Sequence, residues 1–529
     1  MADLNWILEY ESEGRKYTRR GSTPFHGEIH VKSEFTGKIL SLKGSVVLRV
    51  KETEKIFMNG YQTWTYCPEY STQDYIRGVK RLPKRIVDHF SLDRYSDYHF
   101  VDYPEKRGYL HGYSWMYFRD EDKYRFVGSL NEHTGYTRYL YIHQAQLLTI
   151  EKDCEGLEVD GEFSLFDLYA AEGDENTVFD TWFELLQIKP RTTEKLAGYS
   201  SWYNRYQDIS EKAIRQDLSG CKEIFQEGDL FQIDDGWEPY IGDWLEPDKK
   251  KFPSGMKAIC DEIHEAGYKA GLWLAPFVAE RNSQLVKDHP DWLYLHEGKP
   301  WLNGSNWSGF YSLDIDNPEV IQYLEDVFRR VFEDWGIDMV KLDFLYGAAP
   351  FGNAKETRAE RMYRAMDYLR KWCGDHLILG CGVPVMPAFG IVDYCRISCD
   401  VSLDWNDKPH MRIIHRERPS TQQAIQNILS RRQLNNRAYI SDPDVFFLRN
   451  NNIRLTRKVK DLLGRLDALM GGLWLTSDDP SSYDDKQKAQ YRELRKLMDA
   501  EDVDFDYKKK VVRYTLNGKI EELDIRMIL

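Results

Sequence analysis

Charged side chains lie within or directly after short apolar stretches in the second half of the sequence. Lys341 and Asp343 belong to one such stretch, MVKLDFL, and Asp400 lies near the end of another, YCRISCDV. Residues two apart in a strand point to the same side, so Lys341 and Asp343 are expected to share one face. A buried charge of each sign at a strand end needs a partner or a ligand.

Carboxylates that converge on one pocket suit the hydrolysis of a glycosidic bond. This reaction requires one ionised carboxylate and one protonated carboxyl group that assists the departing oxygen. Because Lys341 carries a positive charge, we expect it to hold Asp343 ionised, as a nucleophile requires. Arg396, four residues before Asp400, is expected to meet the hydroxyl groups of a sugar.

Other polar and aromatic residues end the neighbouring apolar stretches and are candidates for the same pocket. They are Trp202, Tyr203, Asp234, Asp235, Trp273, Cys381, Asp442, Asp444, Ser477, Asp478 and Asp479. For any single Asp or Ser, a helix N-cap is the alternative interpretation. For each Trp, packing in the core competes with a role as a platform for a sugar ring. The sequence has no His or Cys ligand cluster, so we expect no metal and no cofactor.

The stretches that carry these residues alternate with segments of helical periodicity. The eight strand candidates are residues 195–203, 229–235, 268–276, 339–345, 376–383, 394–401, 437–445 and 472–480. Between them, apolar residues recur at three- and four-residue steps, which is typical of amphipathic helices. Eight strands and their helices predict an α/β fold, the (β/α)8 or TIM barrel. A doubly wound open sheet is the competing fold, but no GxGxxG follows the first strand.

Two further regions flank the predicted barrel. Short alternating runs separated by Gly, Asp and Asn turns predict an N-terminal β-sandwich domain over residues 1–190, ending in a helical connector at 175–188. The barrel is predicted over 191–499. Short strands around an Asn-Gly turn predict a small C-terminal β-domain over 500–529.

Composition excludes several classes of function. The 72 basic and 86 acidic side chains give a net charge of −14, which argues against binding to nucleic acid or to an anionic membrane. The sequence contains no stretch long and apolar enough for a membrane span, and its beginning does not resemble a signal peptide. The eight cysteines follow no disulfide or metal spacing, so we expect a cytoplasmic protein.

Six segments together resemble one known family. They are NGYQTW (59–64), QIDDGW (232–237), KFPSGMKAI (251–259), GLWLAPF (271–277), VKLDFLYGA (340–348) and LGCGVPVMPAFGIVDYCRISCD (379–400). Their order and spacing resemble those of glycoside hydrolase family 36, the bacterial α-galactosidases of the melibiase type. The resemblance covers nearly the whole chain and is closest to the short bacterial members.

The resemblance implies a retaining α-galactosidase that removes α-linked galactose from oligosaccharides. Asp343 would be the nucleophile and Asp400 the acid/base, while Asp234 and Asp235 would bind the 4- and 6-hydroxyls of galactose. The N-terminal domain would send Trp64 over the active site. The substrate-binding residues expected in all are Trp64, Trp202, Tyr203, Asp234, Asp235, Trp273, Lys341, Cys381 and Arg396. A homo-oligomer is compatible with this interpretation, and the sequence leaves the oligomeric state open.

The chain departs from the family pattern near the acid/base residue. Ser398 and Cys399 stand where short members usually have Gly-Pro, and GCGVP replaces a Cys-Ser-Gly run of the larger members. These differences leave open an α-N-acetylgalactosaminidase, another α-glycosidase of the same fold, or a relative that transfers galactose. A carbohydrate-binding protein without catalysis is the remaining alternative, and the intact Asp343 and Asp400 argue against it.

Overall fold

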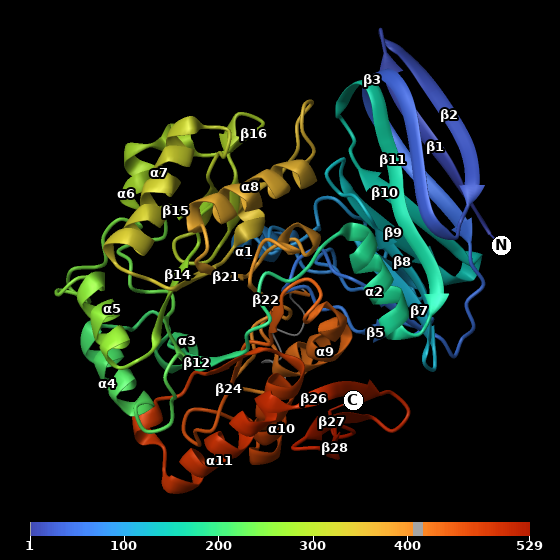
Figure 1. Cartoon of the computed structure of the whole chain (residues 1–529). Coiled ribbons are helices and arrows are strands. Elements are labelled where there is room, and N and C mark those ends of the chain that lie inside the picture. Colours follow the sequence, from blue (N-terminus) through green and yellow to red (C-terminus); the bar gives the residue numbers. More distant parts are fainter. Residues whose placement is uncertain (1, 406–415, 529) are drawn as a thin grey trace.

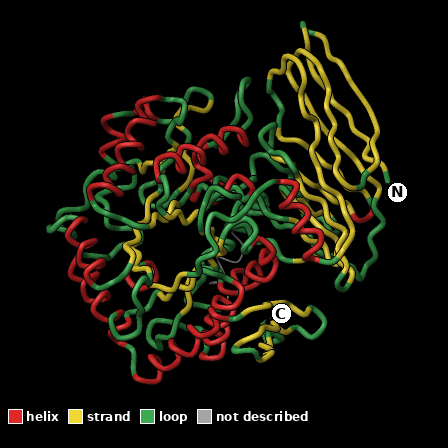
Figure 2. The backbone as a smooth tube through the Cα atoms, in the orientation of Figure 1, coloured by secondary structure: helices red, strands yellow, loops and turns green. Residues whose placement is uncertain are grey.

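The computed structural model describes residues 2–405 and 416–528. Along this part of the chain, a large antiparallel sheet is followed by a ring of parallel strands with helices outside it, and then by a small antiparallel sheet (Figures 1 and 2). The predicted TIM barrel with an N-terminal β-sandwich and a small C-terminal β-region is therefore confirmed. The domain boundaries at residues 190 and 499 stay predictions.

The N-terminal sheet contains eleven strands in one continuous ladder. The strands are β1 (Asp3–Ser12), β2 (Arg15–Pro24), β3 (Gly27–Val47), β4 (Lys55–Met58), β5 (Glu69–Tyr70), β6 (Tyr109–Tyr113), β7 (Trp115–Asp120), β8 (Lys123–Ser129), β9 (Tyr136–Ile142), β10 (Leu147–Asp153) and β11 (Glu158–Gly173). Strand β3 is 21 residues long and pairs with β11 over its first half and with β1 and β10 over its second. This division lets the two halves of the sheet pack face to face, with the rings of Phe118 and Tyr141 5.0 Å apart between them.

The barrel strands are parallel and buried, and each predicted stretch contains one. They are β12 (Leu196–Ser200), β13 (Leu230–Ile233), β14 (Lys269–Leu274), β20 (Met339–Leu342), β21 (Leu377–Gly380), β22 (Tyr394–Arg396), β23 (Ile440–Asp442) with β24 (Val445–Phe446), and β25 (Leu473–Thr476). The seventh strand is interrupted at Pro443 and Asp444. It closes the barrel because β24 pairs with β25 and the Gly472 N–H donates to the Ser441 carbonyl at 3.0 Å.

The helices that follow the N-terminal sheet are α2 (Glu175–Leu186), α3 (Trp202–Arg205), α4 (Glu211–Cys221), α5 (Met256–Glu265), α6 (Gln284–Asp288), α7 (Pro318–Arg329), α8 (Arg358–Cys373), α9 (Thr421–Arg431), α10 (Arg457–Met470) and α11 (Asp485–Arg495). Except for α3 and α5, these helices begin at residues whose side chains accept hydrogen bonds from the first turn. Ser210, Thr357 and Ser420 are such N-caps, for α4, α8 and α9. Helix α2 is the predicted connector, and its buried Trp182 packs against Phe126 of the N-terminal sheet.

The C-terminal sheet consists of β26 (Glu501–Asp506), β27 (Val511–Leu516) and β28 (Lys519–Asp524). Strands β27 and β28 form the hairpin that the Asn-Gly pair predicts. Asn517 and Gly518 have φ angles of 50° and 73°, as a two-residue turn of the type I′ class requires.

One short helix in the N-terminal region was not predicted. Helix α1 (Lys84–Phe90) follows Pro83, and Val87 is its buried residue. Its seven residues are too few for the spacing of Ile86 and Phe90 to stand out as a helical repeat, and most of its side chains do not face a core. Ile86 and Phe90 are 39% and 50% exposed.

A buried polar interface joins the N-terminal region to the barrel. Residues 59–67, here named the bridging loop, lie against α9. The Arg431 guanidinium, which is fully buried, donates to the Asn59 side-chain oxygen and to the carbonyls of Gln62, Thr63 and Ile397.

Asn427, one turn earlier on α9, adds to this interface. Its side-chain nitrogen donates to the Thr65 carbonyl at 3.0 Å, and its oxygen accepts from the Cys67 N–H at 3.0 Å. The bridging loop therefore has one defined position over the barrel.

Replacing Arg431 with Met should destabilise the protein. The change leaves several buried oxygens without donors, each costing about 1–3 kcal/mol, so we expect a loss of about 3 kcal/mol or more in the free energy of unfolding. The midpoint of thermal or urea unfolding measures this loss. Arg329→Met is the matched control, because that side chain is 61% exposed and its ion pair with Asp326 is worth about 1 kcal/mol at most. Equal effects of the two substitutions would contradict the structural role assigned to Arg431.

Candidate active site

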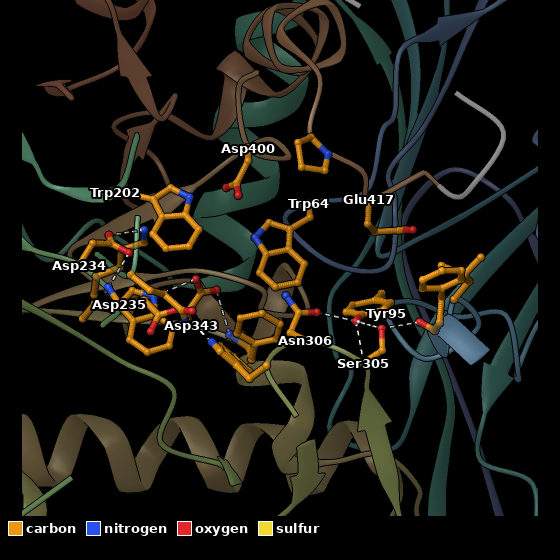
Figure 3. A pocket seen from close by; sticks show the side chains of 18 of the residues that line it. Trp64, Tyr95, Trp202, Asp234, Asp235, Ser305, Asn306, Asp343, Asp400 and Glu417 are labelled. Carbon is orange, nitrogen blue, oxygen red and sulfur yellow. Dashed lines mark hydrogen bonds and ion pairs between the residues drawn. The ribbon is translucent and has the colours of Figure 1, made fainter. Parts of the chain in front are cut away.

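A cavity of about 840 Å³ lies at the carboxyl ends of the barrel strands. Residues of the barrel, of the loops that follow its strands and of the N-terminal region line it (Figure 3). The lining residues are Trp64, Leu82, Ile86, Phe90, Leu92, Tyr95, Trp202, Gln207, Asp234, Asp235, Trp273, Ser305, Asn306, Trp307, Lys341, Asp343, Phe344, Asp400, Glu417 and Pro419.

Asp343 directly follows β20 and is held rigidly. Its backbone N–H donates to the Leu274 carbonyl at 2.8 Å. One carboxylate oxygen accepts from the Trp273 indole N–H at 3.1 Å and the other from the Phe344 N–H at 2.9 Å. Burial raises the pKa of Asp343 above its ordinary value, against the opposing charge of Lys341.

The partner of Lys341 is not the one expected from the sequence. Its ammonium group lies 2.8 Å from the carboxylate of Asp234, at the end of another barrel strand. Lys341 still favours ionisation of Asp343, but burial outweighs it, so the net shift in the pKa of Asp343 is upward. Lys341 therefore acts on Asp343 in the direction expected from the sequence, but its direct ion pair is with Asp234. The long lysine side chain reaches past its own strand, which strand periodicity does not reveal.

The two aspartates after β13 have different surroundings. Asp234 is 2% exposed and accepts from Lys341 and from the Gln232 amide at 2.7 Å. Asp235 accepts from the Gln207 amide at 2.9 Å and the Trp307 indole at 3.0 Å. Both carboxylates also line the cavity, so each combines a fixed position with access to a ligand.

Glu238, which was not predicted from the sequence, supports Asp235 from behind the cavity wall. It is 5% exposed, and its carboxyl group accepts from the Gly236 N–H and hydrogen-bonds Asp235. Burial, together with the charge of Asp235, raises the pKa of Glu238 well above its ordinary value. Burial therefore favours the protonated form of Glu238, and in that form its carboxyl group can donate to Asp235. Its position immediately after the QIDDGW segment was the available signal.

Asp400 faces the cavity from the side opposite Asp343 (Figure 3). Its side chain is 37% exposed and one oxygen lies 2.7 Å from the Arg396 guanidinium. Arg396 also contacts Asp442 and Asp444, both at 2.9 Å, and is 3% exposed. It lies behind Asp400 rather than in the cavity wall. The structure thus gives Arg396 three carboxylate partners in place of the expected sugar hydroxyls.

The remaining predicted residues fall into two groups. Trp64, Trp202 and Trp273 line the cavity. Tyr203 and Cys381 lie behind its wall: the Tyr203 hydroxyl donates to Asp444 at 2.6 Å, and the Cys381 sulfur accepts from the Trp64 indole at 3.2 Å.

The carboxylates that end the last strand have structural partners. Asp478 accepts from the backbone N–H groups of Leu448 and Arg449. Asp479 caps the short helical turn that follows it, and the Ser477 hydroxyl donates to the Ser200 carbonyl at 2.6 Å. For Asp479, the alternative interpretation of such a residue as a helix N-cap is therefore the correct one.

Several lining residues were not predicted. Ser305, Asn306 and Trp307 lie in a long excursion after β14 that contains β15 (Val278–Glu280), β18 (Leu302–Gly304) and β19 (Phe310–Ser312). The length of this excursion, at the carboxyl end of a barrel strand, was a usable signal. The apolar residues contributed by the N-terminal region, in and around α1, had no comparable signal.

The described residues offer a site with several carboxylates, among them the facing pair Asp343 and Asp400, and with aromatic walls. Over residues 2–405 and 416–528, no group of three or more His, Cys, Asp or Glu side chains is placed to hold a metal ion. None of the helices in these ranges is long and apolar enough to cross a membrane. The pair Asp343 and Asp400, facing one cavity, can serve acid/base and nucleophilic chemistry at a sugar carbon.

Comparisons with known proteins point in the same direction. The family model described as Melibiase matches residues 185–370. The α-galactosidase Mel36A of Lactobacillus acidophilus is 30% identical over 151 residues, which are 27% of this chain and 20% of that protein. AgaA of Geobacillus stearothermophilus is 27% identical over 214 residues, which are 36% of this chain and 28% of that protein. The chain thus aligns with less than a third of the length of these curated relatives.

Two solved structures share the fold. The α-galactosidase TtGalA of Thermus thermophilus, in complex with p-nitrophenyl α-D-galactopyranoside, is 26% identical with a TM-score of 0.76, covering 99% of this chain and 100% of that one. The α-galactosidase AgaA of Geobacillus stearothermophilus, described as a family 36 glycoside hydrolase, is 16% identical with a TM-score of 0.59, covering 97% and 71%.

Replacing Glu238 with Gln should change how stability depends on pH. Because the pKa of Glu238 is raised on folding, the folded protein binds a proton that the unfolded chain releases, and stability falls as pH rises above about 4.5. Gln keeps a donor for Asp235 but does not titrate. The variant should therefore gain stability relative to the parent as pH rises, by up to about 1.4 kcal/mol per pH unit. Unfolding midpoints at pH 5, 6, 7 and 8 measure this difference.

The matched control is Glu493→Gln, whose side chain is 69% exposed. Its difference from the parent should stay nearly constant over the same pH series. A loss of stability in Glu238→Gln that is the same at every pH would show that Glu238 does not carry the proton.

Proposed function

The chain belongs to glycoside hydrolase family 36, and on this basis we propose that it is a retaining α-galactosidase. The observation that carries the proposal is the placement of Asp343 and Asp400 on opposite sides of one cavity. TtGalA was solved with p-nitrophenyl α-D-galactopyranoside and with stachyose, so aryl and oligosaccharide α-galactosides are both candidate substrates.

Asp343 acts as the nucleophile in this proposal. Its carboxylate attacks the anomeric carbon while the bond from that carbon to the leaving oxygen breaks, giving a covalent glycosyl ester. The Trp273 indole and the Phe344 N–H hold the two carboxylate oxygens and so fix the direction of attack. Because burial raises the pKa of Asp343, the attacking form is lost at a higher pH than for an exposed aspartate.

Asp400 acts as the acid and then as the base. It donates a proton to the leaving oxygen in the first step and removes one from the attacking water in the second. Arg396 positions its carboxyl group through the 2.7 Å contact and is itself anchored by Asp442 and Asp444. Two successive inversions return the sugar in the α configuration.

The galactose ring binds at the end of the cavity formed by Asp234, Asp235, Lys341 and Trp273. The two carboxylates accept hydrogen bonds from the axial 4-hydroxyl and the 6-hydroxyl. A glucose ring, with an equatorial 4-hydroxyl, would leave a buried carboxylate without its partner. Sites built on such hydrogen bonds discriminate by factors of roughly 10⁴.

Hydrolysis of a panel of p-nitrophenyl α-glycosides tests the function. We expect turnover of the galactoside and, because of the 4-hydroxyl, a kcat/KM for the glucoside that is lower by at least about a thousandfold. The N-acetylgalactosaminide tests the size of the site at the sugar 2-position. Proton NMR during the first minutes should show α-galactose before mutarotation. β-Galactose as the first product would refute the retaining mechanism, and comparable rates on the glucoside would refute the assigned sugar site.

Substitution of the two carboxylates should separate their roles. Asp343→Ala should lose turnover by more than roughly a thousandfold on every substrate, with part restored by azide. Asp400→Ala should lose about 10²–10⁴-fold on melibiose but far less on the p-nitrophenyl substrate, whose leaving group needs no proton. Asp479→Ala, which removes a capping carboxylate outside the cavity, is the control and should keep its activity within a few-fold. Equal losses of the Asp400 variant on both substrates would contradict its role as the acid.

A further inference from the structure

The cavity has two chemically different ends. Asp234, Asp235 and Lys341 form the charged end. Tyr95, Ser305 and Asn306 lie toward the other end, beyond Trp64 and Asp343 (Figure 3). The Ser305 hydroxyl donates to the Phe90 carbonyl at 2.7 Å, which places the end of α1 beside them.

Aliphatic and aromatic side chains from in and around α1 line this second end. They are Leu82, Ile86, Phe90 and Leu92, here named the apolar wall. Ile86 and Phe90 are four residues apart on α1 and therefore project on the same side of the helix. They are 39% and 50% exposed, so a ligand in the cavity would remove apolar surface from water.

The polar groups at this end bind one another. The Tyr95 hydroxyl donates to the Asn306 side-chain oxygen at 2.5 Å, and the Ser305 N–H donates to the Tyr95 hydroxyl at 2.9 Å. The Tyr98 hydroxyl donates to Glu417 at 3.1 Å. A second sugar at this end would have to compete with these bonds for its hydroxyl groups, whereas an apolar group would leave them intact.

We propose that the apolar wall is the binding site of the aglycone, and that the preferred substrates are α-galactosides with an alkyl or aryl aglycone rather than a second sugar. This inference rests on the proposed function, because the galactose ring must occupy the charged end. Three of the four side chains in the wall are aliphatic and offer no aromatic face for a sugar ring to stack on. The wall is continuous with the cavity that holds Asp343 and Asp400, so a leaving group departing from the anomeric carbon lies against it.

Comparison of octyl α-galactoside with methyl α-galactoside tests the preference, because both release a simple alcohol of similar acidity. Below the critical micelle concentration of the octyl compound, we expect its kcat/KM to exceed that of the methyl compound by at least about tenfold. Burial of two methylene groups is sufficient for this ratio. Melibiose, whose aglycone is glucose, should be no better than the methyl compound.

The double variant Ile86→Ser with Phe90→Ser tests the wall itself. It should lower the octyl-to-methyl ratio of kcat/KM by about fivefold or more, because only the octyl chain is long enough to bury these two side chains. The reaction with the methyl compound also reports whether the variant is folded, and each single variant should give an intermediate ratio. Ile520→Ser, which changes an isoleucine of β28 that is 73% exposed, is the matched control and should keep the parental ratio.

Different results would overturn the apolar aglycone site and the proposed function. An octyl-to-methyl ratio near one, or melibiose as the best of the three substrates, would overturn the apolar aglycone site while α-galactosidase activity stands. No activity on any α-galactoside would overturn the proposed function and with it this inference. Light scattering decides whether a second copy of the chain covers the wall instead. An oligomer that the double variant dissociates would assign Ile86 and Phe90 to a subunit contact and overturn the proposal.

Discussion

The cavity depends on the hydrogen bonds that hold the bridging loop against α9. Among residues 2–405 and 416–528, Arg431 has no carboxylate partner there; its guanidinium is satisfied by the Asn59 side chain and by backbone carbonyls, including that of Gln62. Carbonyl groups in a buried loop need donors, and one guanidinium supplies several in a fixed planar arrangement. The loop so held carries Trp64 into the cavity, and the Gln62 amide donates to the Tyr95 carbonyl at 2.6 Å. The N-terminal region therefore forms one wall of a site whose carboxylates belong to the barrel.

Around Asp343 and Asp400, the charged side chains of the barrel form two separate arrangements. Lys341 pairs with Asp234 at the floor of the cavity, while Arg396 joins Asp400 to two deeper carboxylates. Asp343 lies between them with neutral donors, the Trp273 indole and a backbone N–H. A charge that is buried without a direct counter-ion is costly, which is why burial raises the pKa of Asp343. The same desolvation leaves a carboxylate reactive toward an electrophilic carbon.

Much of the architecture was predictable from local pattern. Parallel barrel strands are buried on both faces, so they stand out as apolar runs. In the helices between them, apolar residues recur at the spacing that places them on one face. The hairpin at Asn517 and Gly518 was predictable because few residue pairs tolerate two positive φ angles. Helix α1 was not predicted because its exposed side, with Ile86 and Phe90, faces a cavity rather than a core. Carboxylates at strand ends could be placed near one another because a barrel gathers those ends at one rim.

The sequence by itself determined the barrel, the order of its strands and the candidate residues at their ends, since these follow from periods of two and 3.6 residues within single segments. Only the tertiary structure decided which charges pair. Lys341 contacts Asp234, 107 residues away, and Arg396 faces three carboxylates instead of the open cavity. A long flexible side chain pairs with an opposite charge that lies within its reach on a neighbouring strand. No local sequence pattern gives the distance between the two charges. The joining of α1 and the bridging loop to the barrel rim was decided in the same way, by hydrogen bonds between segments more than 200 residues apart.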